Sequence, residues 1–400
     1  MRVALMTEPF LPKIDGIVTM LTKTIECLRK KGDEVLLFAP SGGPKKLFGA
    51  EVVGLPSAPF PLYRELRVAL PRASMRAKLK AFAPDVIHVF EPVLLGWGGV
   101  YYSQVLKVPL VISSHTNIAA YLQYYRLSLA EGLVWYLMRE RHRRAQLNLA
   151  TSTVTLHDLA KHGIRNLALW ERAVDSHLFR PDARTAEMRD RLSGGEPDKP
   201  LLLYVGRLSA EKEITELRAV IRTVPEARLA IVGDGPERHQ LERYFEGTPT
   251  VFTGYMRGEM LASAYASADL FVFPSQTETL GLVLLESMAS GCPVVACNAG
   301  GIPDAVQDGL TGFLFEPEDP EGLVNTVRRA LSGVTDLDNI RARARQDVEA
   351  HSWEAATDQL RALYAEAVQS RLTVKAKEPV GTLKRVTSRV TLSALRTLLP

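Results

Sequence analysis

Short runs of apolar residues alternate with amphipathic helical patterns along the chain, and this alternation begins twice. Buried strands followed by helices predict a parallel sheet that is covered on both faces. The first set of strands is expected at 3–7, 34–40, 85–90 and 109–115, with helices at 16–31 and 72–83. The second set is expected at 200–206, 227–233, 251–254, 269–274 and 293–297, with helices near 212–223, 236–245, 258–267 and 281–290. The sequence therefore predicts an α/β protein with two doubly wound, Rossmann-like halves.

Two such halves need two hydrophobic cores, and 400 residues are enough for both. The segment LSGGEPDKP at 192–200 is rich in Gly, Pro and charge, as domain linkers are. We expect an N-terminal domain at 1–175, a linker at 176–199 and a C-terminal domain at 200–350. Doubly wound sheets bind ligands beyond the carboxyl ends of their strands. Two facing sheets would therefore hold a substrate in the cleft between the domains.

The three cysteines, Cys27, Cys292 and Cys297, are too few and too odd in number for a disulfide framework. They favour a reducing compartment, on the cytoplasmic side. The N-terminal apolar run is short and is broken by Glu8 and Pro9, unlike a signal peptide. No apolar stretch approaches the roughly 18 residues that a membrane-spanning helix needs. We expect a protein that does not cross a membrane, although it could bind to one.

The net charge of +4 is unevenly distributed, because residues 371–400 carry +6 and the rest of the chain carries −2. This pattern argues against a nucleic-acid-binding protein and for a local anionic partner of the basic tail. Within the tail, 380–399 is interpreted either as a peripheral membrane helix or as a disordered segment. Residues 121–144 mix aromatic side chains with a dense Arg and His run. They suit either a membrane interface or a core helix with one basic face.

The strongest local motif is SQTETLGLVLLESMASG at 275–291, which follows a predicted strand. A helix is expected to begin at Gly281, and its free backbone N–H groups and positive dipole end suit a diphosphate. Glu278 in the loop could accept hydrogen bonds from sugar hydroxyls, and Glu286 in the helix could accept them from a ribose. The alternative interpretation is that Glu278 is an ordinary loop charge and that Glu286 lies on a solvated helix face.

A second motif is GRLSAEKE at 206–213, where Arg207 and Lys212 flank a loop that follows a strand. Together they could neutralise a diphosphate without a metal ion, because Arg forks across two oxygens and Lys adds a point charge. Alternatively, they form surface ion pairs with Glu211 or Glu213.

Two further features lie at strand ends in the N-terminal half. Gly16 follows Asp15 at the start of a predicted helix, which is either another anion site or a plain turn. His115 ends the fourth strand and would lie at the mouth of the cleft, although a lone His is more often structural. His88 lies within a strand and is expected to be structural.

Several common catalytic motifs are missing from the sequence. There is no HExxH, CxxC pair, GxxxxGK[ST] or GxSxG, so zinc-dependent, Walker-type and common hydrolase activities are not expected. No metal-ligand cluster is visible, so we expect no cofactor and no required metal ion, and the sequence leaves Mg²⁺ dependence open.

Taken together, GRLSAEKE, TETLGLVLLE and ESMASGCPVVACNAGGIPD resemble glycosyltransferase family 4 in their order and spacing, and the similarity covers nearly the whole chain. The resemblance implies a GT-B fold with an interdomain active site, and a helix at 351–370 that packs back toward the N-terminal domain. Within the family, TEPFLPKIDGIVT and VFTGYMRGEMLASAYASADLFVFPSQTETLGLVLLESM are similar to the sulfoquinovosyltransferases of cyanobacteria and plants. Those enzymes use UDP-sulfoquinovose and diacylglycerol, at a membrane surface.

The resemblance also implies roles for individual residues. Arg207 and Lys212 would hold the diphosphate, Glu278 would bind the donor sugar, and His115 would contact the sugar near the reacting carbon. The site for the UDP-sugar donor would comprise Gly16, Thr279, Leu280, Gly281 and Glu286, of which Glu286 binds the ribose. Retention of configuration would follow from a reaction on one face of the sugar, in which the enzyme positions groups and stabilises developing charge.

The chain departs from the family pattern at three places, where Glu213, Ala173 and Asp15 stand at positions that usually hold Gly. Glu213 changes the charge beside the proposed diphosphate site. A donor sulfonate would need cations or N–H donors of its own. We name Lys13 and Arg64, both in loops of the N-terminal half, as candidates.

Three rival functions remain open at this stage. The first is a related enzyme that transfers glucose or mannose to another lipid or to a glycan. The second is a non-catalytic module that binds sugar nucleotides, which the presence of both Glu278 and Glu286 disfavours. The third is a nicotinamide dehydrogenase, which the missing GxGxxG fingerprint disfavours.

Overall fold

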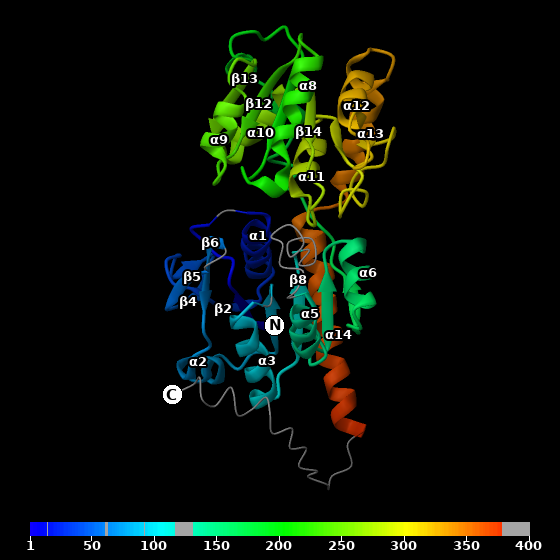
Figure 1. Cartoon of the computed structure of the whole chain (residues 1–400). Helices are drawn as coiled ribbons and strands as arrows, with labels where there is room; N and C mark the ends of the chain where they lie inside the picture. Colours follow the sequence, from blue (N-terminus) through cyan, green and yellow to red (C-terminus); the bar gives the residue numbers. More distant parts are fainter. Residues whose placement is uncertain (14, 61–62, 92, 117–130, 378–400) are drawn as a thin grey trace.

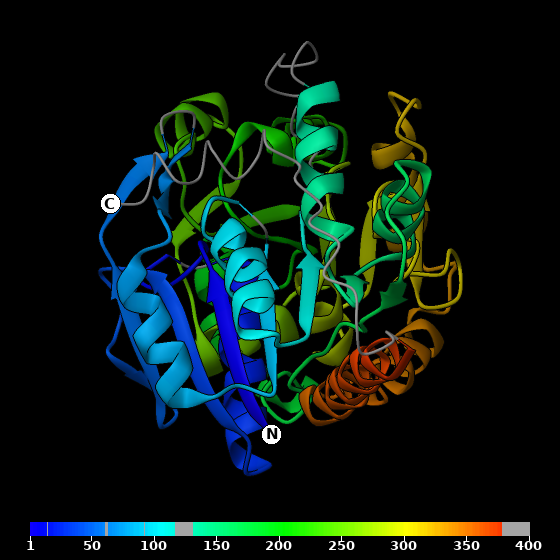
Figure 2. The ribbon, with the colours of Figure 1, turned by 90° about the horizontal axis from the view of Figure 1, so that it is seen from below.

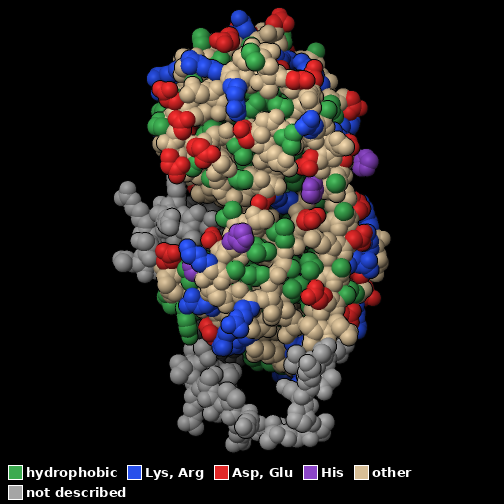
Figure 3. Space-filling view, turned by 90° about the vertical axis from the view of Figure 1, so that its right-hand side faces the viewer, with side chains coloured by type: hydrophobic (Ala, Val, Ile, Leu, Met, Phe, Trp, Pro, Cys, Tyr) green, Lys and Arg blue, Asp and Glu red, His purple; other side chains and the backbone are tan. Residues whose placement is uncertain are grey.

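A computed structural model describes residues 1–13, 15–60, 63–91, 93–116 and 131–377. Two α/β domains are stacked one above the other, with the C-terminal domain uppermost in Figure 1. The predicted architecture of two Rossmann-like domains is confirmed. No helix in the described ranges is both long and apolar enough to cross a bilayer. On the face drawn in Figure 3, acidic and basic side chains are interspersed over both domains.

The N-terminal domain is built on an eight-stranded sheet with the order β10-β9-β8-β7-β1-β2-β4-β3. All neighbouring strands are parallel except the β3–β4 pair. The strands are β1 (Arg2–Thr7), β2 (Glu34–Pro40), β3 (Lys46–Leu47), β4 (Ala50–Leu55), β7 (Val86–Phe90), β8 (Leu110–Ser114), β9 (Leu147–Ala150) and β10 (Leu167–Leu169). The chain turns from one side of β1 to the other, which creates a switch point where ligands of such sheets bind.

Helices cover this sheet, and a small hairpin lies beside it. The helices are α1 (Gly16–Lys30), α2 (Ala73–Phe82), α3 (Leu95–Leu106), α5 (Glu131–His142) and α6 (Thr153–Lys161). The hairpin pairs β5 (Ser57–Phe60) with β6 (Tyr63–Ala69). The four strands and two helices expected in this half are all present, whereas β4, β9 and β10 had not been predicted.

The C-terminal domain has a six-stranded parallel sheet with the order β13-β12-β11-β14-β15-β16. Its strands are β11 (Leu201–Val205), β12 (Arg228–Val232), β13 (Thr250–Gly254), β14 (Leu270–Phe273), β15 (Val294–Cys297) and β16 (Gly312–Phe315). Its helices are α8 (Leu217–Thr223), α9 (Arg238–Tyr244), α10 (Gly258–Ser267), α11 (Leu282–Ala289), α12 (Gly322–Leu331) and α13 (Leu337–Glu349). All five strands expected here are confirmed, and β16 is additional.

The segment between the domains is more structured than its composition suggests. Residues 176–199, expected as a linker, contain the short helix η2 (Pro181–Ala183) and α7 (Ala186–Ser193). Side chains such as Phe179 and Leu192 are buried in the core of the C-terminal domain. The Gly- and Pro-rich composition thus marks only the turn after α7, where Gly194 has a φ of +70°.

The last described helix, α14 (Trp353–Lys377), runs back along the N-terminal domain. Seen from below in Figure 2, it lies along one flank of that domain as the orange-red helix. Trp353, Leu360 and Tyr364 are buried in the same core as strands β1, β2 and β7. Helix α14 therefore completes the core of the N-terminal domain, which begins with β1. The tail 380–399 lies outside the described residues.

The aromatic, basic segment at 121–144 is described only from residue 131 onward, as part of α5. One face of α5 is buried through Trp135 and Met138, while Leu133 and Tyr136 on the helix are exposed by 62% and 49%. This portion is therefore part of the domain and also presents apolar and aromatic side chains to its surroundings.

Candidate functional site

The site lies where the carboxyl ends of β1, β7 and β8 face the start of α11, and contacts between the domains cross it. The Thr279 hydroxyl donates to the carbonyl of His115 at 2.6 Å. The buried guanidinium of Arg172 donates to the carbonyls of Leu280 and Gly301, at 3.2 and 2.9 Å. The side chain of Leu280 packs into the N-terminal core. The loop that precedes α11 is thus held by both domains.

Glu278 is bound by a ring of donors in this loop. Its Oε1 accepts hydrogen bonds from the backbone N–H groups of Thr279, Leu280 and Gly281 at 3.2, 3.1 and 2.9 Å. Its Oε2 accepts one from the Lys212 ammonium at 2.9 Å. Burial raises the pKa of this carboxyl, but Lys212 and the backbone donors outweigh burial and hold the pKa at about 2. The loop is therefore neither an ordinary turn nor a solvated charge: it is an anion-binding site, and the anion that it holds in the structure is the Glu278 carboxylate itself.

Gly281 makes this geometry possible. Its φ of +64° lies in the left-handed region, where glycine carries no steric cost. The backbone can thus turn three consecutive N–H groups toward one oxygen before α11 begins. In the structure these N–H groups bind the Glu278 carboxylate, and the predicted diphosphate contact at this helix start stays a prediction.

Arg207 and Lys212 enter the site from the loop after β11, and both side chains are largely buried. Arg207 donates to Glu211 Oε1 at 3.2 Å, which is the ion pair that the alternative interpretation named. Lys212 instead contacts Glu278, across 66 residues of sequence. Its ammonium also lies 5.5 Å from the centre of the Phe273 ring. Lys212 therefore contacts the loop before α11, whereas Arg207 forms the ion pair with Glu211, and their binding of a diphosphate stays a prediction.

Glu213, one of the departures from the family pattern, occupies a left-handed turn with a φ of +53°. Glycine is the residue that best accepts this conformation, which explains the usual Gly at this position. The Glu213 carboxylate accepts a hydrogen bond from the backbone N–H of Gln276 at 3.2 Å. Burial, followed by repulsion from Glu216, raises its pKa to about 7. This acid is therefore partly protonated at neutral pH, which weakens its field at the diphosphate site.

Glu286 lies one helical repeat into α11 and is partly buried. The Tyr265 hydroxyl donates to its Oε2 at 3.0 Å. Burial raises the pKa of Glu286 to about 7, against a smaller opposite effect of the Tyr265 hydrogen bond. Glu286 is therefore not on a solvated helix face. Its second oxygen can accept a further donor such as a ribose hydroxyl.

His115 is buried at the end of β8 and is fixed by a chain of hydrogen bonds. Its Nε2 lies 2.7 Å from Ser113 Oγ, and Ser113 Oγ lies 2.9 Å from His88 Nε2. The chain continues from His88 Nδ1 to the Tyr364 hydroxyl of α14 at 2.7 Å. Phe90 stacks on the His115 ring with 4.8 Å between centroids. His88 is thus structural, as expected, and His115 is held rigidly at the cleft.

The Nδ1 atom of His115 is buried and has no hydrogen-bond partner among the described residues. Burial lowers the pKa of His115 to about 3, so the imidazole is neutral at physiological pH. A neutral, fixed ring with one unpartnered nitrogen can donate or accept a single hydrogen bond to a substrate.

Two buried acids at strand ends were missed by the sequence reasoning. Glu8 follows β1 and Glu91 follows β7, and each stands directly before a proline, in the similar segments TEP and FEP. Glu91 Oε2 accepts from the backbone N–H of His115 at 2.9 Å and from the Thr116 hydroxyl at 3.1 Å. Burial raises the pKa of Glu91 to about 7 and that of Glu8 to about 8. The repeated acid after a buried strand was the signal that could have identified them.

The start of α1 lies beside the start of α11. Asp15 caps α1, because its Oδ1 accepts a hydrogen bond from Val18 N at 2.8 Å. A Cβ at Gly16 would lie 3.8 Å from Leu282 Cδ1. Two helix N-termini thus converge on one place, which favours the anion site over a plain turn.

Of the two candidate sulfonate residues, Lys13 and Arg64, the structure describes the side chain of Lys13 alone. Lys13 Nζ lies 2.5 Å from Asp15 Oδ2, and Lys13 lines a cavity between the domains. Arg64 belongs to β6, and its side chain lies outside the described part of the chain.

Ala173, at another departure from the family pattern, is buried and packs in the N-terminal core. Across the described ranges, no group of three or more His, Cys, Asp or Glu side chains is arranged to hold a metal ion.

The sequence matches two family profiles and is similar to known transferases. Residues 14–178 match the profile described as Glycosyltransferase Family 4, and residues 189–347 match that of Glycosyl transferases group 1. The chain is 42% identical to sulfoquinovosyl transferase SQD2 of Arabidopsis thaliana over 371 residues, 90% of this chain and 72% of the relative. It is 39% identical to a GDP-mannose-dependent alpha-mannosyltransferase of Mycolicibacterium smegmatis, over 94% of this chain and 100% of the relative.

Solved structures agree on the fold. Sucrose-phosphate synthase from Thermosynechococcus elongatus superposes with a TM-score of 0.76 at 23% identity, over 92% of this chain and 99% of that one. HepE from Anabaena, solved with UDP and glucose, gives a TM-score of 0.71 at 20% identity, over 90% of this chain and 99% of that one. The sequence relationships and the two-domain fold together show that this chain belongs to glycosyltransferase family 4 and is a GT-B glycosyltransferase.

Proposed function

We propose that the protein transfers sulfoquinovose from UDP-sulfoquinovose to diacylglycerol, with retention of configuration at the sugar. The observation that carries this proposal is the anion-binding site around Glu278 and Lys212, in a chain 42% identical to sulfoquinovosyl transferase SQD2. The cations Arg207 and Lys212 suit a nucleoside diphosphate leaving group. HepE, a structural neighbour, was solved with UDP and glucose, in keeping with a sugar-nucleotide donor.

In the proposed reaction, Arg207, Lys212 and the N-terminus of α1 neutralise the diphosphate. The bond between the anomeric carbon and the diphosphate oxygen breaks, and an acceptor hydroxyl oxygen bonds to that carbon from the same face. The hydroxyl proton passes to the leaving diphosphate. Glu286 holds the ribose, and Glu278 and His115 bind the donor sugar. The protein contributes orientation and stabilisation of charge.

A diacylglycerol acceptor places the enzyme at a membrane surface. The exposed Leu133 and Tyr136 on α5, together with the half-buried Arg139 and the exposed Arg143 that follows the helix, suit a peripheral contact with anionic lipids. Another relative, 25% identical, is an alpha-monoglucosyldiacylglycerol synthase of Streptococcus pneumoniae. We therefore propose peripheral association on the cytoplasmic side.

A second donor has its own support. The mannosyltransferase of Mycolicibacterium smegmatis is matched over its full length at 39% identity, and its name specifies GDP-mannose. The competing function is therefore mannosyl transfer to a lipid or glycan acceptor, on the same anion-binding site.

A product assay separates the two. Purified protein is incubated with diacylglycerol liposomes and one donor at a time: UDP-sulfoquinovose, UDP-glucose or GDP-mannose. Lipids are identified by mass spectrometry, and a Lys212→Ala variant is the inactive control. A sulfolipid from UDP-sulfoquinovose alone is the expected result. A mannolipid from GDP-mannose, with no sulfolipid, would replace the proposal by the second function.

A further inference from the structure

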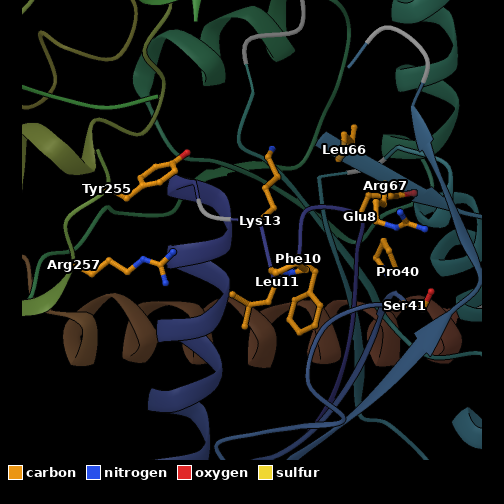
Figure 4. Close-up of a pocket in the computed structure, with 11 residues that line it drawn as sticks. Glu8, Phe10, Leu11, Lys13, Pro40, Ser41, Leu66, Arg67, Tyr255 and Arg257 are labelled. Carbon is orange, nitrogen blue, oxygen red and sulfur yellow. The ribbon is translucent and has the colours of Figure 1, made fainter. Parts of the chain in front are cut away.

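A cavity of about 370 Å³ lies beside the anion-binding site and is lined by both domains. Figure 4 shows the loop that follows β1 on one side, and Tyr255 and Arg257 reaching in from the C-terminal domain on the other. The β6 strand contributes Leu66 and Arg67. The full lining is Glu8, Phe10, Leu11, Pro12, Lys13, Pro40, Ser41, Leu66, Arg67, Tyr255 and Arg257. This volume could hold part of a hexose.

Three cations line the cavity, and two of them, Arg67 and Arg257, make no ion pair with any acid in the described part of the chain. Arg67 donates to Ser57 only through neutral oxygens, at 2.9 Å to Oγ and 2.7 Å to the carbonyl. Arg257 is exposed, and none of the described acids lies within salt-bridge distance of it. Lys13 pairs with Asp15. Guanidinium groups suit a tetrahedral oxyanion, because their N–H donors can engage two oxygens at once.

Glu8 is the one acid that lines the cavity. It is 2% exposed, and one carboxyl oxygen accepts a hydrogen bond from the backbone N–H of Leu95. The other oxygen, Oε2, is buried and has no hydrogen-bond partner within the described part of the chain. Burial raises the pKa of Glu8 to about 8, against the opposing field of Arg141, so the group is mostly protonated at pH 7. A protonated Glu8 adds no negative charge to the cavity wall, so it does not repel an oxyanion there.

We propose that Lys13, Arg67 and Arg257 bind the sulfonate of the donor sugar in this cavity. This assignment rests on the proposed function, because among UDP-sulfoquinovose, UDP-glucose and GDP-mannose only the first carries an anion on the sugar itself. A neutral sugar would gain little from three cations, whereas a sulfonate needs its charge compensated once water is displaced. Phe10 and Leu66 provide apolar walls that limit water and strengthen these contacts.

The site also couples selection of the donor to closure of the two domains. Lys13 and Arg67 belong to the N-terminal domain, while Tyr255 and Arg257 follow β13 in the C-terminal domain. A sulfonate is fully surrounded only when these loops face each other. A donor without the sulfonate would leave Arg257 with no anionic contact across the cleft.

The test compares UDP-sulfoquinovose with UDP, which lacks the sulfonated sugar, by calorimetric titration in the absence of lipid. The variants are Arg67→Gln, Arg257→Gln and the double variant, both positions being exposed and safe for folding. Arg76→Gln, an exposed change on α2, is the matched control. We expect Kd for UDP-sulfoquinovose to rise about 10-fold in each single variant and about 100-fold in the double variant. The affinity for UDP should stay within about twofold.

Three results would overturn the assignment in distinguishable ways. If the wild-type protein makes sulfolipid but the double variant keeps the ratio of the two Kd values, the cavity does not bind the sulfonate. If the double variant instead loses binding to phosphatidylglycerol vesicles and keeps UDP-sulfoquinovose affinity, the anion is a lipid headgroup. If the wild-type protein makes no sulfolipid from UDP-sulfoquinovose, the proposed function itself fails, and this site assignment falls with it.

Discussion

The C-terminal wall of the cleft holds its ionisable groups as charged pairs, whereas the N-terminal wall, called the neutral wall below, shifts the pKa values of its groups toward their neutral forms. The C-terminal wall consists of Arg207, Lys212 and Glu278, and the N-terminal wall of Glu8, Glu91 and His115. Lys212 and backbone donors hold the pKa of Glu278 at about 2 despite its burial. Across the cleft, burial raises the pKa of both acids and lowers that of His115 to about 3. One wall is thus suited to a diphosphate, and the other to hydroxyl groups and sugar carbons.

The largest effect is expected when the charged wall loses its cation. Lys212→Ala leaves Glu278 buried without its ion-pair partner and removes a contact to the diphosphate. We expect kcat/KM to fall about 10³-fold, in the range known for loss of a key charge-stabilising donor. Steady-state kinetics check this, with Lys161→Ala on exposed α6 as the control. Activity within tenfold of wild type would show that the charge of this wall is not needed.

The neutral wall can be disturbed through Ser113, which bridges His115 and His88. Ser113→Ala leaves both Nε2 atoms without this partner, so the His115 tautomer is no longer fixed. We expect kcat to fall about 10- to 100-fold, corresponding to one lost hydrogen bond at a buried group, with little change in KM for the donor. Ser113→Thr should restore most of the activity.

A purely structural role for Ser113 would not alter the ring of His115 itself. The ¹⁵N shifts of His115 in the two variants provide that readout. Unchanged shifts together with a lower melting temperature would argue that Ser113 only supports the fold.

A smaller effect concerns Glu286, which, like Glu213, belongs to the C-terminal domain but resembles the neutral wall in its raised pKa. Burial raises its pKa from 4.5 to about 7. Its carboxyl therefore binds a proton below that pH and accepts ribose hydroxyls best above it. We expect KM for the donor to fall severalfold as the pH rises from about 6 to 8. Glu286→Gln should abolish this step, which separates it from the titration of Glu91 and Glu213. A pH step that survives in the variant belongs to another group.

The same shift has a consequence for stability. An unfolded carboxyl ionises near 4.5, so the folded protein binds the proton more tightly over the range from 4.5 to about 7. The contribution of Glu286 to folding stability is therefore present at low pH and is lost as the pH rises through about 7.

The smallest effect tests the turn beside the charged wall. Glu213→Gly relieves a left-handed residue with a φ of +53° and removes a half-buried carboxyl. We expect the free energy of unfolding to rise by about 0.5–1 kcal/mol, because relief of strain exceeds the added freedom of the unfolded chain. Chemical denaturation measures it. A decrease would mean that the hydrogen bond to Gln276 outweighs the strain.

The difference between the walls also explains what the sequence could predict. The charged wall comes from two motifs that are each contiguous in sequence, and the resemblance to glycosyltransferase family 4 brought Lys212 and Glu278 into one hypothesis. The neutral wall depends on contacts between distant segments. His88 links Ser113 to Tyr364 of α14 by two hydrogen bonds, and 250 residues lie between Ser113 and Tyr364 in the sequence. No periodicity marks Glu8 or Glu91 as buried acids, and the pairing of Arg207 with Glu211 follows from local geometry that sequence leaves open.

The course of α14 has a consequence for how the molecule is made. Synthesis delivers β1 first, yet the core around β1 includes Trp353, Leu360 and Tyr364 from the far end of the chain. The first domain to leave the ribosome can therefore be finished only after the second domain has been synthesised. Until then its apolar flank is exposed. A chain truncated before residue 353 would therefore have an intact C-terminal domain beside an N-terminal domain with an incomplete core.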